Sequence, residues 1–346
     1  MSSRSILMIG NFLPSPKHNK NVWHFLAEKL AETGWSVITT SDKDNQFIRL
    51  LDMLFTIWRR RYSYQVAHID VFSGKAFIYA KLSTVLLKLL KKTIVLTLHG
   101  GGLPDFSMKY PRSVRRLVLA ADVVVTPSVY HQKAFSHIRS DIEQIPNPID
   151  LREAIYRERK KVVPRLIWVR AFHDVYNPNM AISVLHLLSL EYLEVELCML
   201  GPDKGDGSLE SALKLAKKLG IESKLQLVGH VTHGEVPRWL DKADIFINTS
   251  NYDTAPRSLL EAMGNGLCVV STNVGGIPLI ATDRFEAILV DPDDFEGMAL
   301  AVKQVLDSPE LANKLSKNAR LRAEQSDWSK ILPKWDELFS KLLQSI

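Results

Sequence analysis

The sequence has few cysteines and no long apolar run. Only Cys198 and Cys268 occur among its 346 residues, far apart and inside apolar, strand-like segments. Their spacing suits no metal site, and both are expected to be small buried residues of a protein from a reducing compartment. No apolar segment approaches the length that spans a bilayer. The start, MSSRSILMIG, shows no signal peptide, so a cytoplasmic location is expected, with peripheral contact at the inner membrane face left open.

Signals for nucleic acid and for metal are also missing. No basic stripe with interleaved aromatic residues and no known reading motif occurs, which argues against a nucleic-acid partner. No Asp-x-Asp signature stands at a strand end with a clear partner, so neither a metal nor another cofactor is expected. The net charge of +6, from 44 basic and 38 acidic residues, favours anionic ligands such as nucleotide diphosphates, or an anionic membrane surface.

Short apolar runs alternate with helical patterns along the chain, which predicts parallel sheets built from strand–helix units. The predicted strands cover 6–9, 36–40, 66–69, 94–98, 123–126, 142–145, 166–170, 194–200, 224–228, 245–248, 268–271 and 287–290. The predicted helices cover 22–32, 48–64, 80–92, 179–190, 209–219, 237–241 and 257–263, and the chain is helix-rich after 294. A charged, proline-punctuated stretch, 151–164, predicts a linker between an α/β domain at 1–150 and a second at 165–327.

The segment 253–278, DTAPRSLLEAMGNGLCVVSTNVGGIP, combines a loop, a helix start and a strand. In an α/β sheet this order forms a crevice where nucleotides bind. Pro256 suits the first helical turn, and the positive end of the helix dipole favours a diphosphate. The N–H groups at this helix start belong to Arg257, Ser258 and Leu259. Glu261, one turn further, can accept hydrogen bonds from a ribose diol, and Asp253 can accept them from a sugar.

These residues resemble the donor-binding signature of the family 4 retaining glycosyltransferases. The stretches P-R-S-L-L-E-A-M and T-N-V-G-G-I-P match, while the first acid is Asp253 where the family has Glu. The resemblance implies a GT-B fold, in which two doubly wound Rossmann-like domains face a cleft. It implies a nucleotide-sugar donor, a hydroxyl acceptor and retention of configuration by a front-face route. It also implies that a last helix, 328–346, packs back on the first domain.

The resemblance also assigns the remaining site residues. His99, before three glycines, would contact the donor sugar, and Arg170 would clamp the diphosphate. The family's second clamping cation, a Lys, is replaced in the region of Tyr176. Catalytic roles therefore go to His99, Arg170 and Asp253. Donor-binding roles go to Gly10, Tyr176, Gly229, Arg257, Ser258, Leu259 and Glu261.

Simpler interpretations stay open for several of these positions. His99 can be bonded to a loop carbonyl, and Arg170 can belong to a surface ion pair. The segment after Gly10, with Lys17, His18 and Lys20, can be an ordinary surface loop. His233 is expected to face solvent.

The function most consistent with these features is sugar transfer to a sugar, a lipid-linked sugar or a small molecule, in glycan or glycolipid biosynthesis. One alternative is a degenerate relative that binds a nucleotide sugar without turnover, which the missing Lys favours. A second is a sugar-nucleotide epimerase of the same fold. Trp58 and Tyr62 flank Arg59, Arg60 and Arg61, a composition that keeps a peripheral membrane role open.

Overall fold

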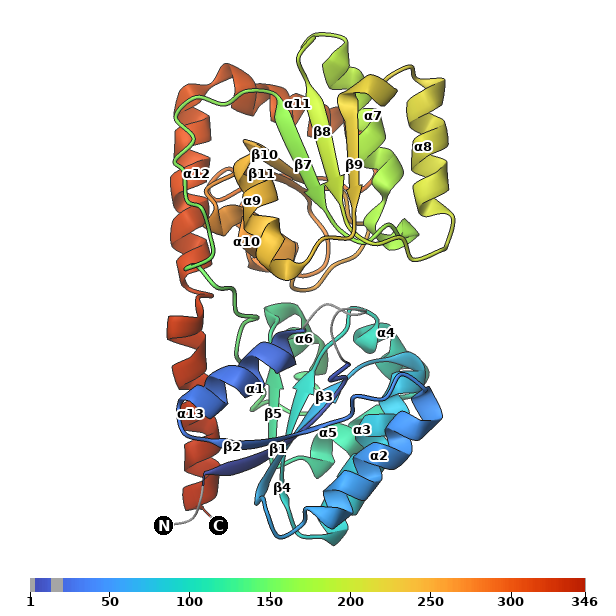
Figure 1. Ribbon diagram of the computed structural model, residues 1–346, viewed down its shortest axis with the longest axis vertical. Coiled ribbons are helices and arrows are strands. Elements are labelled where there is room, and N and C mark those ends of the chain that lie inside the picture. Colours follow the sequence, from blue (N-terminus) through green and yellow to red (C-terminus); the bar gives the residue numbers. More distant parts are fainter. Residues whose placement is uncertain (1–3, 14–20, 346) are drawn as a thin grey trace. The chain divides into compact units, whose positions relative to one another are not determined.

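The computed structural model describes residues 4–13 and 21–345, and the chain divides into two compact units. The first unit contains Met1–Pro148 and Ser329–Ile346, and the second contains Ile149–Trp328. Figure 1 shows a parallel sheet with helices on both faces in each unit. Lys17, His18 and Lys20 lie outside the described residues.

The sheet of the first unit is six-stranded and parallel, in the order β2-β1-β3-β4-β5-β6. Its strands are β1 (Ser5–Ile9), β2 (Ser36–Thr40), β3 (Val66–Val71), β4 (Thr93–Leu98), β5 (Val123–Thr126) and β6 (Glu143–Gln144). The strand order reverses between β1 and β3. The carboxyl ends of these two strands therefore form the crevice where α/β sheets bind ligands.

Helices cover both faces of this first sheet. They are α1 (Val22–Glu32), α2 (Gln46–Arg59), α3 (Phe77–Leu89), α4 (Leu103–Lys109), α5 (Pro111–Ala120), α6 (Val129–Phe135) and the last helix, α13 (Trp328–Gln344). The face with α2, α3 and α5 contains an aliphatic core. The opposite face is aromatic, because Trp335 of α13 meets the rings of Trp23 and His68 at 5.9 and 5.4 Å.

The sheet of the second unit is also six-stranded and parallel, in the order β12-β11-β10-β7-β8-β9. Its strands are β7 (Arg165–Val169), β8 (Glu196–Leu200), β9 (Leu225–Gly229), β10 (Ile245–Asn248), β11 (Cys268–Thr272) and β12 (Ile288–Val290). The order reverses between β7 and β10. The ligand crevice of this sheet is therefore expected where the loops after these two strands meet.

The second sheet is covered by two groups of helices. They are α7 (Pro178–Ser189), α8 (Ser208–Lys218), α9 (Val236–Asp241), α10 (Arg257–Gly264), α11 (Phe295–Asp307) and α12 (Pro309–Glu324). One apolar core contains residues of α7, α8 and α11, and the other contains residues of α9 and α10. α12 contributes to both cores.

The predicted strands and helices match observed ones with their ends shifted by a few residues, whereas no range was predicted for α4, α5 and α6. Two further differences are local. β6 has only two residues, since both are exposed polar side chains at the sheet edge. Pro256 caps α10 in an extended conformation instead of lying in its first turn. Within the described residues, no helix is both long and apolar enough to cross a bilayer.

Candidate functional site

Arg170 and Asp253 meet at the crevice of the second unit. Arg170 directly follows β7, and Asp253 lies in the loop after β10. The Arg170 Nη2 donates to Asp253 Oδ2 at 2.5 Å, and Nε donates to Asn248 Oδ1 at 3.3 Å. Only 12% of the Arg170 side chain and 13% of the Asp253 side chain are exposed. Arg170 therefore forms a shielded pair with a second predicted site residue, and the surface ion pair considered from the sequence does not describe it.

Tyr176 supports Arg170 through its ring. It ends the 3-10 turn η2 (Asp174–Tyr176), and its ring centroid lies 5.1 Å from the Arg170 guanidinium carbon. Burial raises the pKa of the Tyr176 hydroxyl, so the side chain is neutral at ordinary pH. Tyr176 gives a cation–π contact where the resemblance expects a second cation.

Two glycines keep backbone close to this pair. A Cβ at Gly275 would lie 2.0 Å from the Asp253 carbonyl oxygen, and one at Gly201 would lie 1.7 Å from that of Arg170. Gly201 in turn donates its N–H to the carbonyl of Gly229 at 2.8 Å. Gly229, expected near the nucleotide base, is thus linked to the Arg170 loop through one hydrogen bond.

The start of α10 lies in the same region. The Leu260 N–H donates to the carbonyl of the N-cap, Pro256, at 3.5 Å, so the N–H groups of Ser258 and Leu259 precede the helical ladder. The Ser258 hydroxyl is buried and has no hydrogen-bond partner within the described part of the chain. Unsatisfied donors at a helix start are the groups that an anionic oxygen can occupy.

Glu261 lies one turn into α10 and is held by its own helix. The Arg257 Nε lies 2.9 Å from Glu261 Oε1, and the His233 Nδ1 lies 3.7 Å from the same oxygen. Burial raises the pKa of Glu261, and the charge of Arg257 opposes this shift. A small hollow opens beside Glu261, lined also by Asp150 and Glu153.

The expectation that His233 faces solvent is wrong. Its side chain is only 24% exposed, and it contacts the Arg257 guanidinium. Burial and then the charge of Arg257 lower the pKa of His233 to about 4, so the ring is neutral near pH 7. The short 3-10 turn that begins at His233 directs this ring toward α10, a tertiary effect without a local sequence signal.

In the first unit, His99 and Gly10 both follow strands at the carboxyl edge of the sheet. The His99 Nε2 has no hydrogen-bond partner among the described residues, and its nearest recorded acid oxygen is Asp70 Oδ1 at 3.9 Å. Burial lowers the pKa of His99 to about 3, and His131 adds to this shift. It is His131, through Nε2, that contacts the carbonyl oxygen of Gly100, at 3.1 Å.

The sequence did not single out Asp70, which belongs to this cluster. Asp70 lies near the end of β3, and a Cβ at Gly10 would lie 3.5 Å from its Cβ. Burial raises the pKa of Asp70 well above its usual range, and the nearby Trp23 side chain opposes this shift only in part. The available signal was an acid directly after an uncharged predicted strand, beside the crevice that Gly10 and His99 mark.

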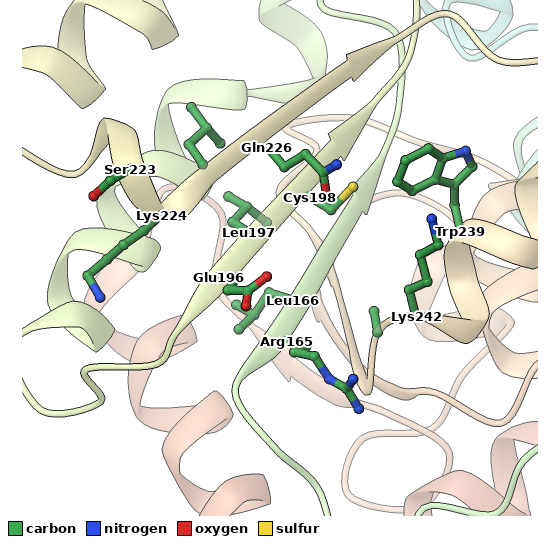
Figure 2. Close-up of a pocket in the computed structure, with 12 residues that line it drawn as sticks. Arg165, Leu166, Glu196, Leu197, Cys198, Ser223, Lys224, Gln226, Trp239 and Lys242 are labelled. Atoms are coloured by element: carbon green, nitrogen blue, oxygen red, sulfur yellow. The ribbon is translucent and has the colours of Figure 1, made fainter.

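A separate hollow of about 230 Å³ lies on one face of β7, β8 and β9. In Figure 2 the Lys242 amino group lies beside the Trp239 ring, at 3.9 Å from its centroid. Arg165 and Glu196, also in its lining, begin their strands, so the hollow lies toward the amino edge of the sheet. It does not include the predicted donor residues. No cluster of metal-ligating side chains occurs among the described residues.

The architecture is that of known GT-B glycosyltransferase structures. The sucrose-phosphate synthase of Thermosynechococcus elongatus superposes with a TM-score of 0.81 at 17% identity, covering 99% of this chain and all of the other. HepE of Anabaena in complex with UDP-glucose superposes with a TM-score of 0.79 at 16% identity, and the match covers 99% of this chain and all of HepE. The predicted fold class is confirmed.

The similarity to a known family lies in the second unit, where residues 154–322 match the model of the glycosyl transferases group 1. A glycogen synthase of Mycobacterium tuberculosis is 30% identical over 37% of this chain and 31% of its own length. The 2-deoxystreptamine N-acetyl-D-glucosaminyltransferase of Niallia circulans is 32% identical over 37% of this chain and 32% of its own. The matches thus span about a third of these relatives.

Proposed function

We propose that this protein transfers a sugar from a nucleotide-sugar donor to a hydroxyl acceptor with retention of the anomeric configuration. The acceptor hydroxyl belongs to a sugar, a lipid-linked sugar or a small molecule, in glycan or glycolipid synthesis. The observation that carries the proposal is the position of Arg170 beside Asp253, at the point where the second sheet reverses its strand order. The cytoplasmic location expected from the sequence stays a prediction.

In this proposal the second unit binds the donor. The Arg170 guanidinium and the N–H groups at the start of α10 stabilise the diphosphate as negative charge develops on it. The buried Ser258 hydroxyl is a further donor there. Glu261 accepts from the ribose diol, as the family resemblance implies, and its side chain lines the small hollow described above. Asp253 then holds a sugar hydroxyl and orients Arg170 at the same time.

The first unit takes the acceptor in this proposal. His99 is neutral, because burial holds its pKa at about 3, so it binds sugar hydroxyls without adding charge. In the front-face route the leaving phosphate takes the acceptor proton, and His99 needs no proton transfer. The anomeric configuration of the product, read by NMR, tests this point. Inversion would instead make the His99–Asp70 pair a candidate general base.

One observation favours a second candidate, nucleotide-sugar binding without turnover. Arg170 is paired with an acid, and its neighbour Tyr176 is neutral. The diphosphate would then meet less positive charge than two cations provide.

A panel of nucleotide sugars separates the two candidates. Thermal unfolding with each compound identifies the bound donor, since a ligand of the folded state raises the melting temperature. UDP-sugars come first, because HepE was solved with UDP-glucose. Release of nucleoside diphosphate and incorporation of sugar into acceptors then measure turnover. Binding with no release of diphosphate would leave the second candidate, and no binding of any nucleotide sugar would contradict both.

A further inference from the structure

Helix α2 of the first unit has two apolar faces, and only one of them is buried. Met53 and Ile57 point into the core of the sheet. The opposite face carries large apolar side chains that are between 51% and 69% exposed: Phe47, Ile48, Leu51, Phe55 and Trp58. At 3.6 residues per turn these five positions fall within an arc of about 100°, so they form one continuous stripe. Burial in this unit does not explain the stripe, and contiguous exposed apolar surface marks an interaction site.

The C-terminal end of this stripe is aromatic and basic. Arg59, Arg60 and Arg61 follow directly, and Tyr62 is 86% exposed. The Arg61 guanidinium carbon lies 4.7 Å from the Trp58 ring centroid and 4.5 Å from that of Tyr62. Aromatic rings with adjoining arginines are the composition of a helix that lies in a membrane interface.

Helix α3 extends the same surface. Its outer side exposes Ile78, Val85 and Leu89, with Lys81 next to them and Lys88, which pairs with Asp122 at 3.5 Å. Both helices bury their inner sides in one core, and the Tyr79 hydroxyl of α3 donates to the Gln46 carbonyl of α2 at 3.1 Å. Their outer sides therefore face away from the same side of the sheet.

The charges on this surface are distributed unevenly. Asp52 is the single acid within α2 and α3, and the Thr40 hydroxyl donates to it. Asp42 and Asp44 precede α2 at its N-terminal end, whereas the three arginines lie at the other end. An anionic partner is therefore favoured, with the arginine end of α2 nearest to it. A second copy of this chain is the competing occupant, because antiparallel packing would bring the arginines of one α2 against Asp42 and Asp44 of the other.

We propose that the first unit docks on an anionic bilayer surface through the outer face of α2, supported by α3. The apolar stripe enters the interface between headgroups and acyl chains, and the arginines bind lipid phosphates. The docking does not depend on the transferase reaction, because lipid binding is measured without any donor. A lipid-linked acceptor would gain from it, since acceptor and enzyme would share one surface.

Co-sedimentation with vesicles tests the charge part of the proposal. The purified chain is expected to bind vesicles of phosphatidylcholine with phosphatidylglycerol, and to bind phosphatidylcholine alone far less. Replacing Arg59, Arg60 and Arg61 by Gln should lower the partition coefficient by about 100-fold at low salt, at about fivefold per basic residue. The matched control removes three positive charges from α8 of the second unit, with Lys214, Lys217 and Lys218 changed to Gln. If both variants lost vesicle binding equally, net charge alone would explain the binding, and the proposed docking surface would be wrong.

A second pair of variants tests the apolar stripe. Leu51→Ser with Phe55→Ser should weaken binding to anionic vesicles at least tenfold, whereas Leu190→Ser with Leu193→Ser, exposed in the second unit, should leave it unchanged. Brominated lipids should quench tryptophan fluorescence, and Trp58→Phe should remove most of that quenching. Circular dichroism and sedimentation velocity check the fold and the oligomeric state. Quenching unchanged by Trp58→Phe, or a dimer that dissociates with the stripe variant, would contradict the proposal.

Discussion

At the scale of single residues, the most consequential contact is that between Arg170 and Asp253. Each neutralises the other in a shielded position, so a bound diphosphate must compete with Asp253 for the guanidinium. Removing one partner of such a pair leaves an uncompensated charge, which costs more than the pair itself contributes. The pair therefore couples the stability of the second unit to the chemistry of its crevice.

Replacing Arg170 by Ala should reduce turnover by about 100- to 1,000-fold, the effect of losing one preorganised charge-stabilising donor. Affinity for the donor should fall less, because the α10 start still binds the diphosphate. Initial rates and donor titrations on one preparation separate the two effects. Arg165→Ala, at the other end of β7, is the control. If Tyr176→Lys raises turnover, the missing second cation limits the reaction. If Arg170→Ala leaves turnover unchanged, another residue binds the diphosphate.

Replacing Glu261 by Gln should weaken donor binding by about 1–3 kcal/mol, the scale of a hydrogen bond to a charged group. Calorimetric titration with the donor measures this change. Glu210→Gln is the matched control, since Glu210 also pairs at i,i+4 with a cation, Lys214, but on an exposed helix. Undiminished affinity in a folded Glu261→Gln protein would exclude Glu261 from the ribose site.

The sequence identified most of these side chains but not their partners. The residues of 253–278 form one continuous strand–loop–helix segment, so local spacing is enough to place Glu261 beside a helix start. The Arg170–Asp253 contact joins residues 83 positions apart and depends on how β7 pairs with β10. Asp70 was missed for a similar reason: its neighbours Gly10 and His99 follow other strands.

At the scale of elements, the strands were predictable because buried parallel strands are nearly continuous apolar runs with turn residues at both ends. The ends of helices were less predictable. Pro256 has the fixed φ of a first helical turn, yet it lies one position earlier, with an extended ψ of 112°. The loop from Asp253, tied by its carbonyl to the N–H of Gly276, sets that position, and no local pattern records it.

The loop after β8 gives an element-scale prediction. Gly201→Ala should destabilise the second unit by more than about 3 kcal/mol, because its Cβ would overlap the Arg170 carbonyl oxygen, an overpacked contact that backbone must move to relieve. Gly205→Ala, in the same loop, also has a positive φ but has no atom near its Cβ. It should cost only about 1–2 kcal/mol. Urea unfolding measures both. Equal losses would show that the loop moves freely away from Arg170.

The buried histidines of the first unit, on β3, directly after β4 and on α6, give a pH prediction. Burial lowers the pKa of His68 and His99 to about 3 and that of His131 to about 4, against 6.5 when unfolded. Below pH 6.5 the unfolded chain binds protons that the folded chain does not, so the free energy of unfolding decreases as the pH is lowered. At pH 5 the loss should be about 2 kcal/mol per histidine.

Urea unfolding at pH 7 and pH 5 checks this pH effect. Asp70 works in the opposite direction, because its raised pKa removes stability as pH increases. The histidine effect is therefore best isolated in an Asp70→Asn background. In that background His131→Asn should reduce the difference between the two pH values, and His137→Asn, an exposed change, should not. No difference between pH 7 and pH 5 would contradict the prediction.

At the scale of the whole molecule, sequence order and spatial membership differ. Ser329–Ile346 follows the second unit in sequence but belongs to the first. Within it, Trp335 and Phe339 are buried against the aromatic face of the first sheet, and the Asp336 carboxylate accepts from the Trp35 indole at 2.6 Å. The first core is therefore complete only with α13.

A chain ending at Trp328 should keep a folded second unit and lose a stable first unit. Loss of one buried Trp or Phe side chain costs about 3–5 kcal/mol, and this truncation removes both Trp335 and Phe339. Their sum is comparable to the whole stability of a domain, about 5–15 kcal/mol. Hydrogen exchange resolved along the chain measures the two units separately. Protection retained throughout β1–β5 in the truncated chain would contradict this prediction, and Trp335→Ala in the full chain should show a milder form of it.

The position of α13 also sets an order of events during synthesis. A ribosome releases all of Ile149–Trp328 before the helix that completes the first core emerges. The second unit can therefore reach its native state while the first, although translated earlier, still exposes an aromatic surface around Trp23 and His68. During that interval the nascent chain is a target for chaperones that bind apolar surface.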